Sequence, residues 1–220
     1  IANEVLLNNI HVLMEKPIAT TVEEAEKLRD LAKSKGLVLV VGHIERFNPA
    51  VMKLREMILN GEIGEVKSII TRRLSPMPPQ IKDANVVIDL AVHDVDICCY
   101  LIDDLPISTD GNLGKAVLKD RADYAQILLK FKNEASAVVE VNWVTPIKIR
   151  TLAITGTKGY AELDYMTQEV VFYENDKDKV QVNVEKKEPL RSEISHFLKC
   201  IETKEEPINS AQMGRDALDV

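Results

Sequence analysis

Residues 37–41 (Leu-Val-Leu-Val-Val) form an unbroken run of leucine and valine that ends at Gly42. Such a run is typical of a strand that is buried on both faces, as the strands of a parallel sheet are. A parallel strand needs a partner that is reached by a crossover connection, which is usually a helix. The run therefore predicts a second strand and a connecting helix close by in the chain.

Both elements are found directly upstream. Residues 10–14 are a short apolar run, and Pro17 ends it because proline lacks a backbone donor. Thr21 and Glu24 have the spacing of a capping box, which begins a helix, and Gly36 supplies the end of that helix. The chain is therefore predicted to run strand–helix–strand here.

This segment corresponds to the second half of a doubly wound sheet. Residues 4–9 are interpreted as the end of an earlier helix. The chain begins at Ile1 rather than methionine, and it contains no G-x-G-x-x-G dinucleotide fingerprint. We predict that residues 1–44 are the C-terminal part of a Rossmann-type dinucleotide-binding domain whose N-terminal part is absent.

A different pattern begins after residue 44. The predicted elements are a helix opened by Asn48-Pro49 and closed by Gly61, a strand at 66–74, a helix at 87–102, consecutive strands between 117 and 184, and helices at 190–201 and 211–220. The strands at 124–131 and 135–145 flank a short hairpin connection, and the second alternates apolar with polar residues. Such alternation is typical of an antiparallel sheet with one covered face. Residues 45–220 are therefore predicted to form an α+β domain with a large, mostly antiparallel sheet covered on one face by helices.

Composition narrows the class of protein. The 220 residues are 45% hydrophobic and carry a net charge of −7, which disfavours binding to nucleic acid or to an anionic membrane. No apolar run approaches the ~20 residues that span a bilayer, and no signal peptide opens the chain. Cys98, Cys99 and Cys200 form no disulfide framework, which favours a reducing compartment. We expect a cytoplasmic protein.

Asp89 and His93 are the main candidates for chemistry. They are four residues apart on a predicted helix, so they share one face with Cβ atoms about 6 Å apart. The helix is apolar nearly all round, and polar groups on such a helix must find partners or face a cavity. A purely structural role explains the pattern equally well. In that case His93 is a core histidine that is hydrogen-bonded to Asp89, and Asp94 and Asp96 lie in solvent. A metal site is a further possibility, but neither H-E-x-x-H nor a second clustered histidine is present, and we expect no metal.

Lys16 favours the functional interpretation. It follows a buried strand within Glu15-Lys16-Pro17, so it is predicted to lie at the carboxyl edge of the parallel sheet, where open α/β sheets bind ligands. A lysine followed by proline is more often a surface residue on a turn. The proline also permits a cis peptide bond, which would fix the direction of the lysine side chain.

Three further residues are candidates for substrate binding. Arg46 and Asn48 lie at the predicted domain junction, and clefts between domains are favoured ligand sites. Arg46 could instead pair with Glu45 or cap a helix. Arg73, from the pair Arg72-Arg73 on a predicted strand, could bind a carboxylate or pyrophosphate by bidentate hydrogen bonds, although such a pair is usually surface charge.

Three motifs in chain order resemble the glucose–fructose oxidoreductase / inositol dehydrogenase (Gfo/Idh/MocA) family. They are Glu15-Lys16-Pro17, Arg46-Phe47-Asn48-Pro49 and Asp89-x-x-x-His93, and the resemblance covers essentially the whole chain. It implies an NAD- or NADP-dependent sugar or cyclitol dehydrogenase, with a Rossmann domain followed by a sheet domain. That second domain is implied to bind substrate and to form a homo-oligomer, a dimer or tetramer, through its sheet.

The resemblance also implies roles for individual residues. Lys16 is expected near the nicotinamide and the substrate hydroxyl, with Glu15 and Pro17 as its cofactor-binding neighbours. His93 is expected to be the catalytic acid/base, and Asp89 to bind or orient the substrate.

The segment from Gly42 to Asp94 is most similar to the nucleotide-sugar branch of the family, the UDP-N-acetylglucosamine 3-dehydrogenases and their uronic-acid relatives. This implies oxidation of a secondary sugar hydroxyl, at C3 of a UDP-N-acetyl-hexosamine. Two alternatives stay open, which are a non-catalytic ligand-sensing or oligomerisation module of the same fold and an inositol or simple-sugar dehydrogenase. A third is a metal-dependent lyase or isomerase that uses the acids around His93. Because the main phosphate-binding loop is absent, we expect these 220 residues alone to have negligible NAD affinity and no turnover.

Overall fold

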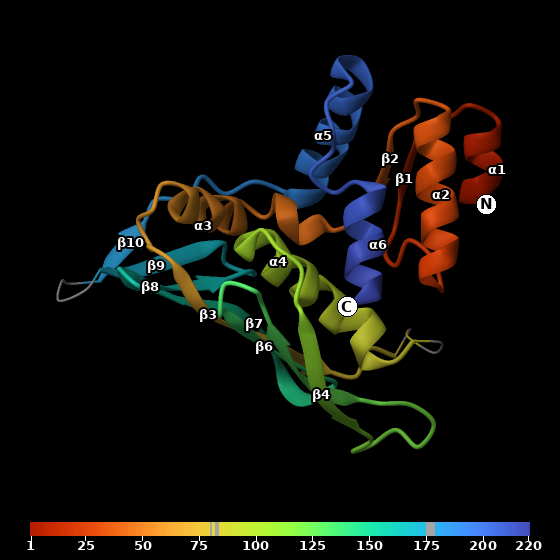
Figure 1. Cartoon of the computed structure of the whole chain (residues 1–220). Coiled ribbons are helices and arrows are strands. Elements are labelled where there is room, and N and C mark those ends of the chain that lie inside the picture. Colours follow the sequence, from red (N-terminus) through yellow and green to blue (C-terminus); the bar gives the residue numbers. More distant parts are fainter. Residues whose placement is uncertain (80, 82–83, 175–178) are drawn as a thin grey trace. The chain divides into compact units, whose positions relative to one another are not determined.

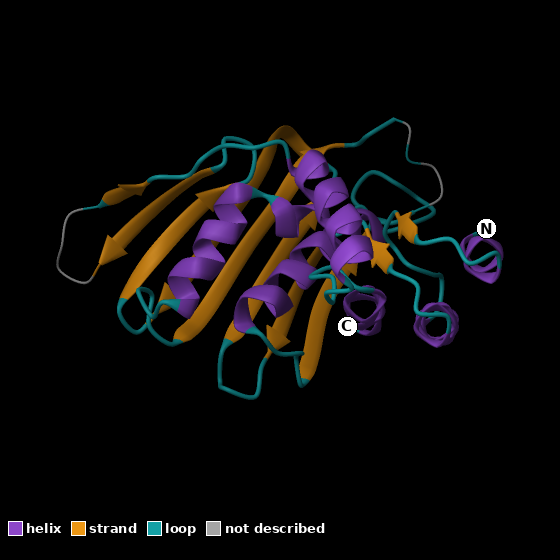
Figure 2. Ribbon diagram, turned by 90° about the horizontal axis from the view of Figure 1, so that it is seen from above, coloured by secondary structure: helices purple, strands orange, loops and turns teal. Residues whose placement is uncertain are grey.

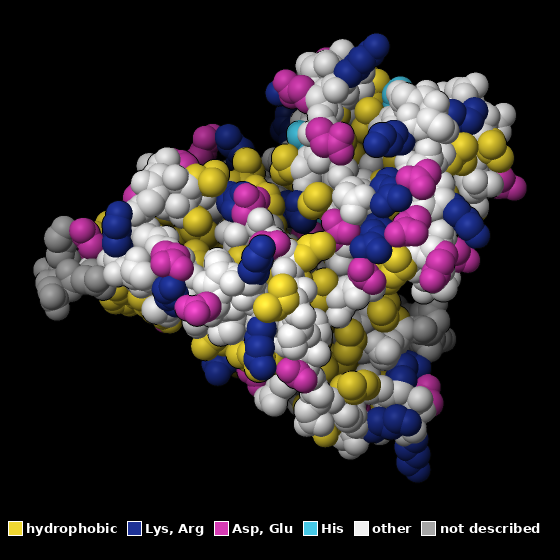
Figure 3. Space-filling view, in the orientation of Figure 1, with side chains coloured by type: hydrophobic (Ala, Val, Ile, Leu, Met, Phe, Trp, Pro, Cys, Tyr) yellow, Lys and Arg dark blue, Asp and Glu magenta, His cyan; other side chains and the backbone are white. Residues whose placement is uncertain are grey.

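The computed structural model of the chain describes residues 1–79, 81, 84–174 and 179–220. It divides into two compact units: Ile1–Phe47 together with Lys187–Val220, and Asn48–Lys186. Within the described part, none of the helices combines the length and the apolar character that a membrane span requires. Acidic and basic side chains are interspersed over the face drawn in Figure 3.

The first unit contains a small parallel sheet and the helices that pack on it (Figure 1). Its elements are α1 (Ala2–Leu7), β1 (Val12–Met14), α2 (Val22–Ser34), β2 (Leu39–Val41), the 3₁₀ helix η1 (Ile44–Phe47), α5 (Pro189–Thr203) and α6 (Ala211–Asp219). Strands β1 and β2 are parallel, with Val12 opposite Leu39 and Met14 opposite Val41. The predicted strand–helix–strand order is therefore confirmed.

The ends of α2 follow from local chemistry. The Thr21 hydroxyl accepts a hydrogen bond from the Glu24 backbone N–H at 3.3 Å, as the predicted capping box requires. The Glu24 carboxylate also accepts a hydrogen bond from the Thr20 hydroxyl at 2.6 Å. Gly36 follows the helix with φ of +63°, a left-handed conformation that glycine adopts without steric cost.

The C-terminal segment belongs to this first unit. Val41 donates its backbone N–H to the Asn209 carbonyl at 2.9 Å, Val40 and Ser210 form an antiparallel bridge, and α6 packs on α2 and β2. The assignment of the whole range 45–220 to the sheet domain is therefore corrected, because residues 187–220 return to cover the small parallel sheet. Two amphipathic helices carry no local sign of which distant sheet they will cover.

The second unit is built on an eight-stranded sheet. Its elements are α3 (Pro49–Leu59), β3 (Val66–Pro76), the π-helical turn η2 (Val87–Ala91), α4 (Val92–Ile102), β4 (Ser108–Gly114), β5 (Tyr124–Lys130), β6 (Ser136–Asn142), β7 (Val144–Gly156), β8 (Gly159–Asp164), β9 (Glu169–Glu174) and β10 (Val180–Val182). The strand order is β10-β9-β8-β7-β3-β6-β5-β4, and every neighbouring pair is antiparallel except β3 and β6.

Helices cover one face of this sheet (Figure 2). Helix α3 packs on β8 and β9, and α4 packs on β3 and β6. On β3 the residues Ile69, Thr71 and Arg73 are buried beneath the helices, whereas Ile70 and Arg72 on the other face are exposed. The predicted fold class, an α/β remnant followed by a mostly antiparallel sheet covered on one face, is confirmed.

The predicted strands between 117 and 184 need one correction. Residues 115–123 form a loop, and the unpredicted strand β4 (Ser108–Gly114) precedes it at the edge of the sheet. Asp123 holds the loop, because its carboxylate accepts the backbone N–H groups of Ala116, Val117 and Leu118, each at 2.7 Å. Burial would raise the pKa of Asp123, but these hydrogen bonds outweigh it and hold the pKa below its usual value. Residues 175–178 of the predicted stretch lie outside the described residues.

A buried carboxyl group fastens α5 to the small sheet of the first unit. Glu193 is only 2% exposed, and it accepts a hydrogen bond at 3.0 Å from the Asn209 side chain, which also donates to the Val41 carbonyl at 2.9 Å. Burial raises the pKa of Glu193 to about 7, and the negative charge of Glu15 adds to the rise, while the bond from Asn209 lowers it.

Glu193 should therefore make the folded chain less stable as the pH rises. Its pKa is about 7 in the folded state against a usual 4.5, so its stabilisation is complete below pH 4.5 and is lost as the pH passes 7. At about 1.4 kcal/mol per pH unit this amounts to about 3–4 kcal/mol. We expect the difference in unfolding free energy between wild type and Glu193→Gln to fall by this amount between pH 4.5 and 8, as measured by urea denaturation.

Glu202→Gln is the matched control, because Glu202 lies on the same helix and is exposed. It should keep the pH dependence of the wild type. An unchanged pH dependence in Glu193→Gln would contradict the assignment.

Candidate functional site

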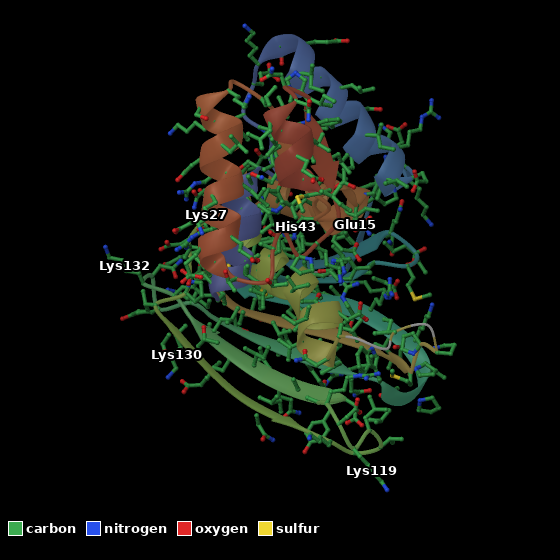
Figure 4. All side chains as sticks on the ribbon, turned by 90° about the vertical axis from the view of Figure 1, so that its right-hand side faces the viewer. Glu15, Lys27, His43, Lys119, Lys130 and Lys132 are labelled. Atoms are coloured by element: carbon green, nitrogen blue, oxygen red, sulfur yellow. The ribbon has the colours of Figure 1, made fainter. Side chains whose placement is uncertain are left out.

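The ends of β1 and β2 lie side by side in the first unit. The Gly42 backbone N–H donates to the Met14 carbonyl at 2.7 Å, so the residues that follow each strand are neighbours. A Cβ atom on Gly42 would lie 3.1 Å from a carboxylate oxygen of Glu15, which leaves little room for a larger residue. Figure 4 labels Glu15 and His43 at this strand end. These are the carboxyl ends of parallel strands, the position at which open α/β sheets bind ligands.

Lys16 follows Glu15 at this edge. Its side chain is half-buried, the Glu15 side chain is exposed, and the Lys16–Pro17 peptide bond is cis. The predicted position of Lys16 at the edge of the sheet is therefore found.

The segment after β2 is buried and tightly turned. His43 is 2% exposed, its N–H donates to Val41 and its carbonyl accepts from the Arg46 N–H at 3.1 Å. The Arg46 guanidinium is also buried and donates to the Ile208 carbonyl. This bond ties η1 to the C-terminal segment, which gives Arg46 a structural partner; its predicted contact with a substrate stays a prediction.

Asn48 has two structural partners within the second unit. Its side-chain oxygen accepts from the Ala50 N–H at 3.1 Å and caps α3, which begins with Pro49. Its side-chain nitrogen donates to the Tyr165 carbonyl at 3.1 Å. With both groups engaged in a buried position, Asn48 is a capping residue, and its predicted contact with a substrate is also left as a prediction.

Asp89 and His93 lie on a helix that changes its winding between them. Asp89 belongs to the π-helical turn η2, and His93 lies in the first turn of α4. Both side chains are half-buried. Four residues make about one full turn in either form of helix, so the two side chains keep to the same side. Single π-helical turns inside α-helices occur frequently at functional sites.

Asn85 supports the start of this segment, and the sequence did not identify it. Its side-chain oxygen accepts the N–H groups of Val87 and Ile88, both at 3.0 Å. An asparagine just before an apolar run is a recognisable capping signal, so this residue could have been found.

Arg73 and Asp94 correct the sequence interpretation most clearly. The alternative of a core histidine placed Asp94 in solvent, but Asp94 is fully buried and forms an ion pair with Arg73, with distances of 2.7 and 3.3 Å. Asp96 is buried as well, at 2% exposure. Arg73 is 3% exposed, so it is not the surface charge that such an arginine pair usually is. Its predicted contact with a substrate stays a prediction.

The alternative of a metal site requires several ligands close together. Among the described residues, no group of three or more His, Cys, Asp or Glu side chains is placed to hold a metal ion. The pairing of Asp94 with Arg73 removes one carboxylate from the set that such a site would need.

Lys16 belongs to the first unit, whereas Asp89 and His93 belong to the second. The structure brings Glu15, Lys16 and Gly42 together at one strand end, and Asp89 and His93 together on one helix. Their meeting at a common substrate remains a proposal. Glu193, which the sequence did not identify, lies close enough to Glu15 for the two charges to interact.

Comparison with protein families gives two matches along the chain. Residues 1–43 match the oxidoreductase family with an NAD-binding Rossmann fold, and residues 51–162 match the GFO/IDH/MocA C-terminal domain. The second match alone spans half of the chain.

Individual relatives agree with these matches. UDP-N-acetylglucosamine 3-dehydrogenase from Acidithiobacillus ferrooxidans is 29% identical over 210 residues, which cover 91% of this chain and 66% of that protein. Myo-inositol 2-dehydrogenase from Thermotoga maritima is 24% identical over 227 residues, covering 94% and 67%. The chain thus spans about two thirds of the length of these relatives.

Solved structures give the same picture of the fold. The structure of the Acidithiobacillus ferrooxidans enzyme superposes on this chain with a TM-score of 0.92 at 28% identity. The superposition covers 99% of this chain and 70% of the chain of that enzyme. An aldose–aldose oxidoreductase from Caulobacter crescentus has the same fold, with a TM-score of 0.90 at 19% identity and the same coverage. The chain therefore belongs to the Gfo/Idh/MocA oxidoreductase family, with residues 1–43 in its NAD-binding Rossmann part and residues 51–162 in its C-terminal domain.

Proposed function

We propose that the protein is an NAD(P)-dependent dehydrogenase that oxidises a secondary hydroxyl of a sugar, at C3 of a UDP-N-acetyl-hexosamine. The observation that carries this proposal is the pair Asp89–His93, half-buried on one side of a helix within the part that matches the family's C-terminal domain. The similarity to UDP-N-acetylglucosamine 3-dehydrogenase supports the choice of substrate.

The first unit supports the choice of cofactor. Its matched segment is of the NAD-binding type, and Glu15-Lys16-Pro17 lies at the carboxyl edge of parallel strands, which fits a nicotinamide placed beside that edge. Lys16, with Glu15 and Pro17 as neighbours, would hold this end of the cofactor. When bound, the cofactor would supply the acceptor for the hydride that leaves the sugar carbon.

Three side chains of this chain would serve the reaction. His93 would accept the hydroxyl proton, a task suited to histidine because its unperturbed pKa lies near neutrality. Lys16 would donate a hydrogen bond to the same oxygen and stabilise the negative charge that develops on it. Asp89, on the same helix side as His93, would orient the sugar or the imidazole ring. The proposal requires Lys16 and His93 to reach one hydroxyl.

An inositol dehydrogenase is the second candidate, because myo-inositol 2-dehydrogenase is similar over 94% of the chain. The two activities can be separated by measuring initial rates of NADH formation by the full-length protein. We expect a higher kcat/KM for UDP-N-acetylglucosamine than for myo-inositol. A reversed preference would favour the second candidate, and no reduction of NAD or NADP with either substrate would favour a ligand-sensing module.

His93→Gln in the full-length protein should lower kcat by roughly 10²–10⁴-fold, the usual contribution of general acid–base catalysis. Glutamine keeps a polar side chain but cannot take up the proton. Steady-state kinetics on wild type and variant would measure the loss, with melting temperatures to verify that both are folded. A variant with wild-type kcat would exclude His93 from this role.

Lys16→Met should also reduce kcat, because the positive charge near the developing oxyanion is lost. Lys27→Met is the matched control, since Lys27 is an exposed lysine of the same unit and is labelled in Figure 4. It should leave kcat unchanged.

We also propose that the protein forms a homo-oligomer through the open face of the large sheet. The strand registers place Leu128, Val138, Ile70 and Ala153 side by side across four neighbouring strands. Ile70 and Val138 are 44% and 38% exposed. An apolar row across an open sheet face favours burial against another protein surface, and a second copy of the same chain is the partner we propose.

Ile70→Arg should therefore convert the oligomer into a monomer, because a buried, unpaired charge in the interface is costly. Sedimentation velocity on the full-length protein would measure the change. Leu59→Arg is the control, since Leu59 is 69% exposed at the end of α3 and away from the open sheet face. Retention of the wild-type mass by Ile70→Arg would contradict this interface.

A further inference from the structure

The residue that follows His93 is held by an arginine from the sheet. Asp94 is fully buried, and its two carboxylate oxygens accept from Nε and Nη2 of Arg73 at 2.7 and 3.3 Å. A carboxylate and a guanidinium that meet through two atoms each fix orientation as well as distance. The pair joins the first turn of α4 to the central strand β3.

Arg73 is itself fixed from its other side. Its guanidinium carbon lies 5.1 Å from the centre of the Tyr165 ring, a cation–π contact. The Tyr165 backbone carbonyl accepts the hydrogen bond from Asn48, the cap of α3. A buried chain of contacts thus runs from Asn48 through Tyr165 and Arg73 to Asp94, and it involves two of the residues that the sequence suggested for substrate binding.

The anchored side of α4 determines where His93 points. Asp94, Cys98 and Leu101 recur at helical spacing and are fully buried. Burial, followed by the negative charge of Asp94, raises the pKa of the Cys98 thiol well above its usual range, which places both on the same buried side. His93 is one residue, or about 100° around the helix axis, from Asp94. A rotation of α4 about its axis would therefore move the His93 imidazole directly.

Stability alone gives a weak reason for such a pair. Replacing both members of a buried ion pair by apolar residues of similar size is often neutral or stabilising, whereas removing one member is costly. A planar, two-bond contact fixes a rotation that apolar packing leaves less well defined. For this pair, a fixed orientation of α4 on β3 is the benefit that the two-bond geometry supports.

We propose that Arg73 is a positioning residue, which fixes the rotation of α4 through Asp94 and thereby aims the His93 imidazole at the substrate hydroxyl. The inference rests on the proposed function of His93. It assigns to Arg73 a role in which the guanidinium touches neither substrate nor cofactor.

The first test uses Arg73→Lys in the full-length protein, with UDP-N-acetylglucosamine and NAD as substrates. Lysine keeps the charge beside Asp94 but loses the fork that fixes rotation. We expect kcat to fall about 10-fold or more, since a displacement of about 1 Å can cost about 10²-fold, while KM for both substrates stays within about 2-fold. A purely structural role would lower the melting temperature and leave kcat of the folded enzyme unchanged, which would overturn the proposal.

Arg72→Lys is the matched control. Arg72 is the neighbouring arginine on the opposite face of β3, where it is exposed and pairs with Glu140 at 3.1 Å. It should leave kcat and the melting temperature unchanged.

The double variant Arg73→Met/Asp94→Leu covers the case in which Arg73→Lys fails to fold. It removes both members of the pair together, a change that buried ion pairs often tolerate without loss of the fold. We expect it to retain the KM values and to lose kcat as Arg73→Lys does. A folded double variant with wild-type kcat would also overturn the proposal.

The second test does not require turnover. The 220 residues contain four histidines, so ¹³C labelling of the histidine rings gives few NMR signals from this part of the protein. The signal that disappears in His93→Gln is that of His93. In Arg73→Lys this signal should shift or broaden, whereas in Arg72→Lys it should match the wild type. The two proposals can fail separately. If the wild type oxidises no sugar, the proposed function is wrong. If the His93 signal of Arg73→Lys matches that of the wild type, Arg73 does not position His93.

Discussion

Burial of charged side chains is the constraint on which both units depend. A charge that leaves water must find a partner, because its desolvation costs more than most single contacts return. Asp94 meets Arg73, Asp123 meets three backbone N–H groups, and Glu193 meets Asn209. The first contact ties a helix to a strand, the second closes the loop at residues 115–123 on itself, and the third ties helix α5 to the segment that follows it and to the end of β2. Because these polar contacts are directional, they fix orientations of segments that apolar packing alone defines less well.

The features predictable from the sequence are those whose cause is local. The run at 37–41 indicated a buried parallel strand, Thr21 and Gly36 bounded the helix before it, and the pattern at 87–102 indicated one long helix. Strand β4 could not be predicted in this way. Its seven residues are mostly polar and exposed, and it is a strand because the edge of β5 offers a partner.

The candidate site divides in the same way. The side chains with suitable chemistry, Lys16, Asp89 and His93, are recognisable from their types and spacing. The partners of Arg46, Asn48 and Arg73 are not, because Ile208, Tyr165 and Asp94 are distant in sequence and no local pattern marks them. An arginine that will bind an anion and one that will hold a buried aspartate look alike in a sequence. Only the three-dimensional arrangement separates a side chain that faces a ligand from one that supports it.

The return of residues 187–220 to the first unit makes the large sheet an insertion within that unit. During synthesis the whole of the sheet unit therefore leaves the ribosome before the last helices of the first unit exist. A domain interrupted in this way cannot complete its fold in simple N-to-C order, whereas the contiguous insertion can fold as soon as it emerges. Until then the small parallel sheet lacks the α6 helix that packs on β2 and α2, which leaves apolar surface for a chaperone to shield.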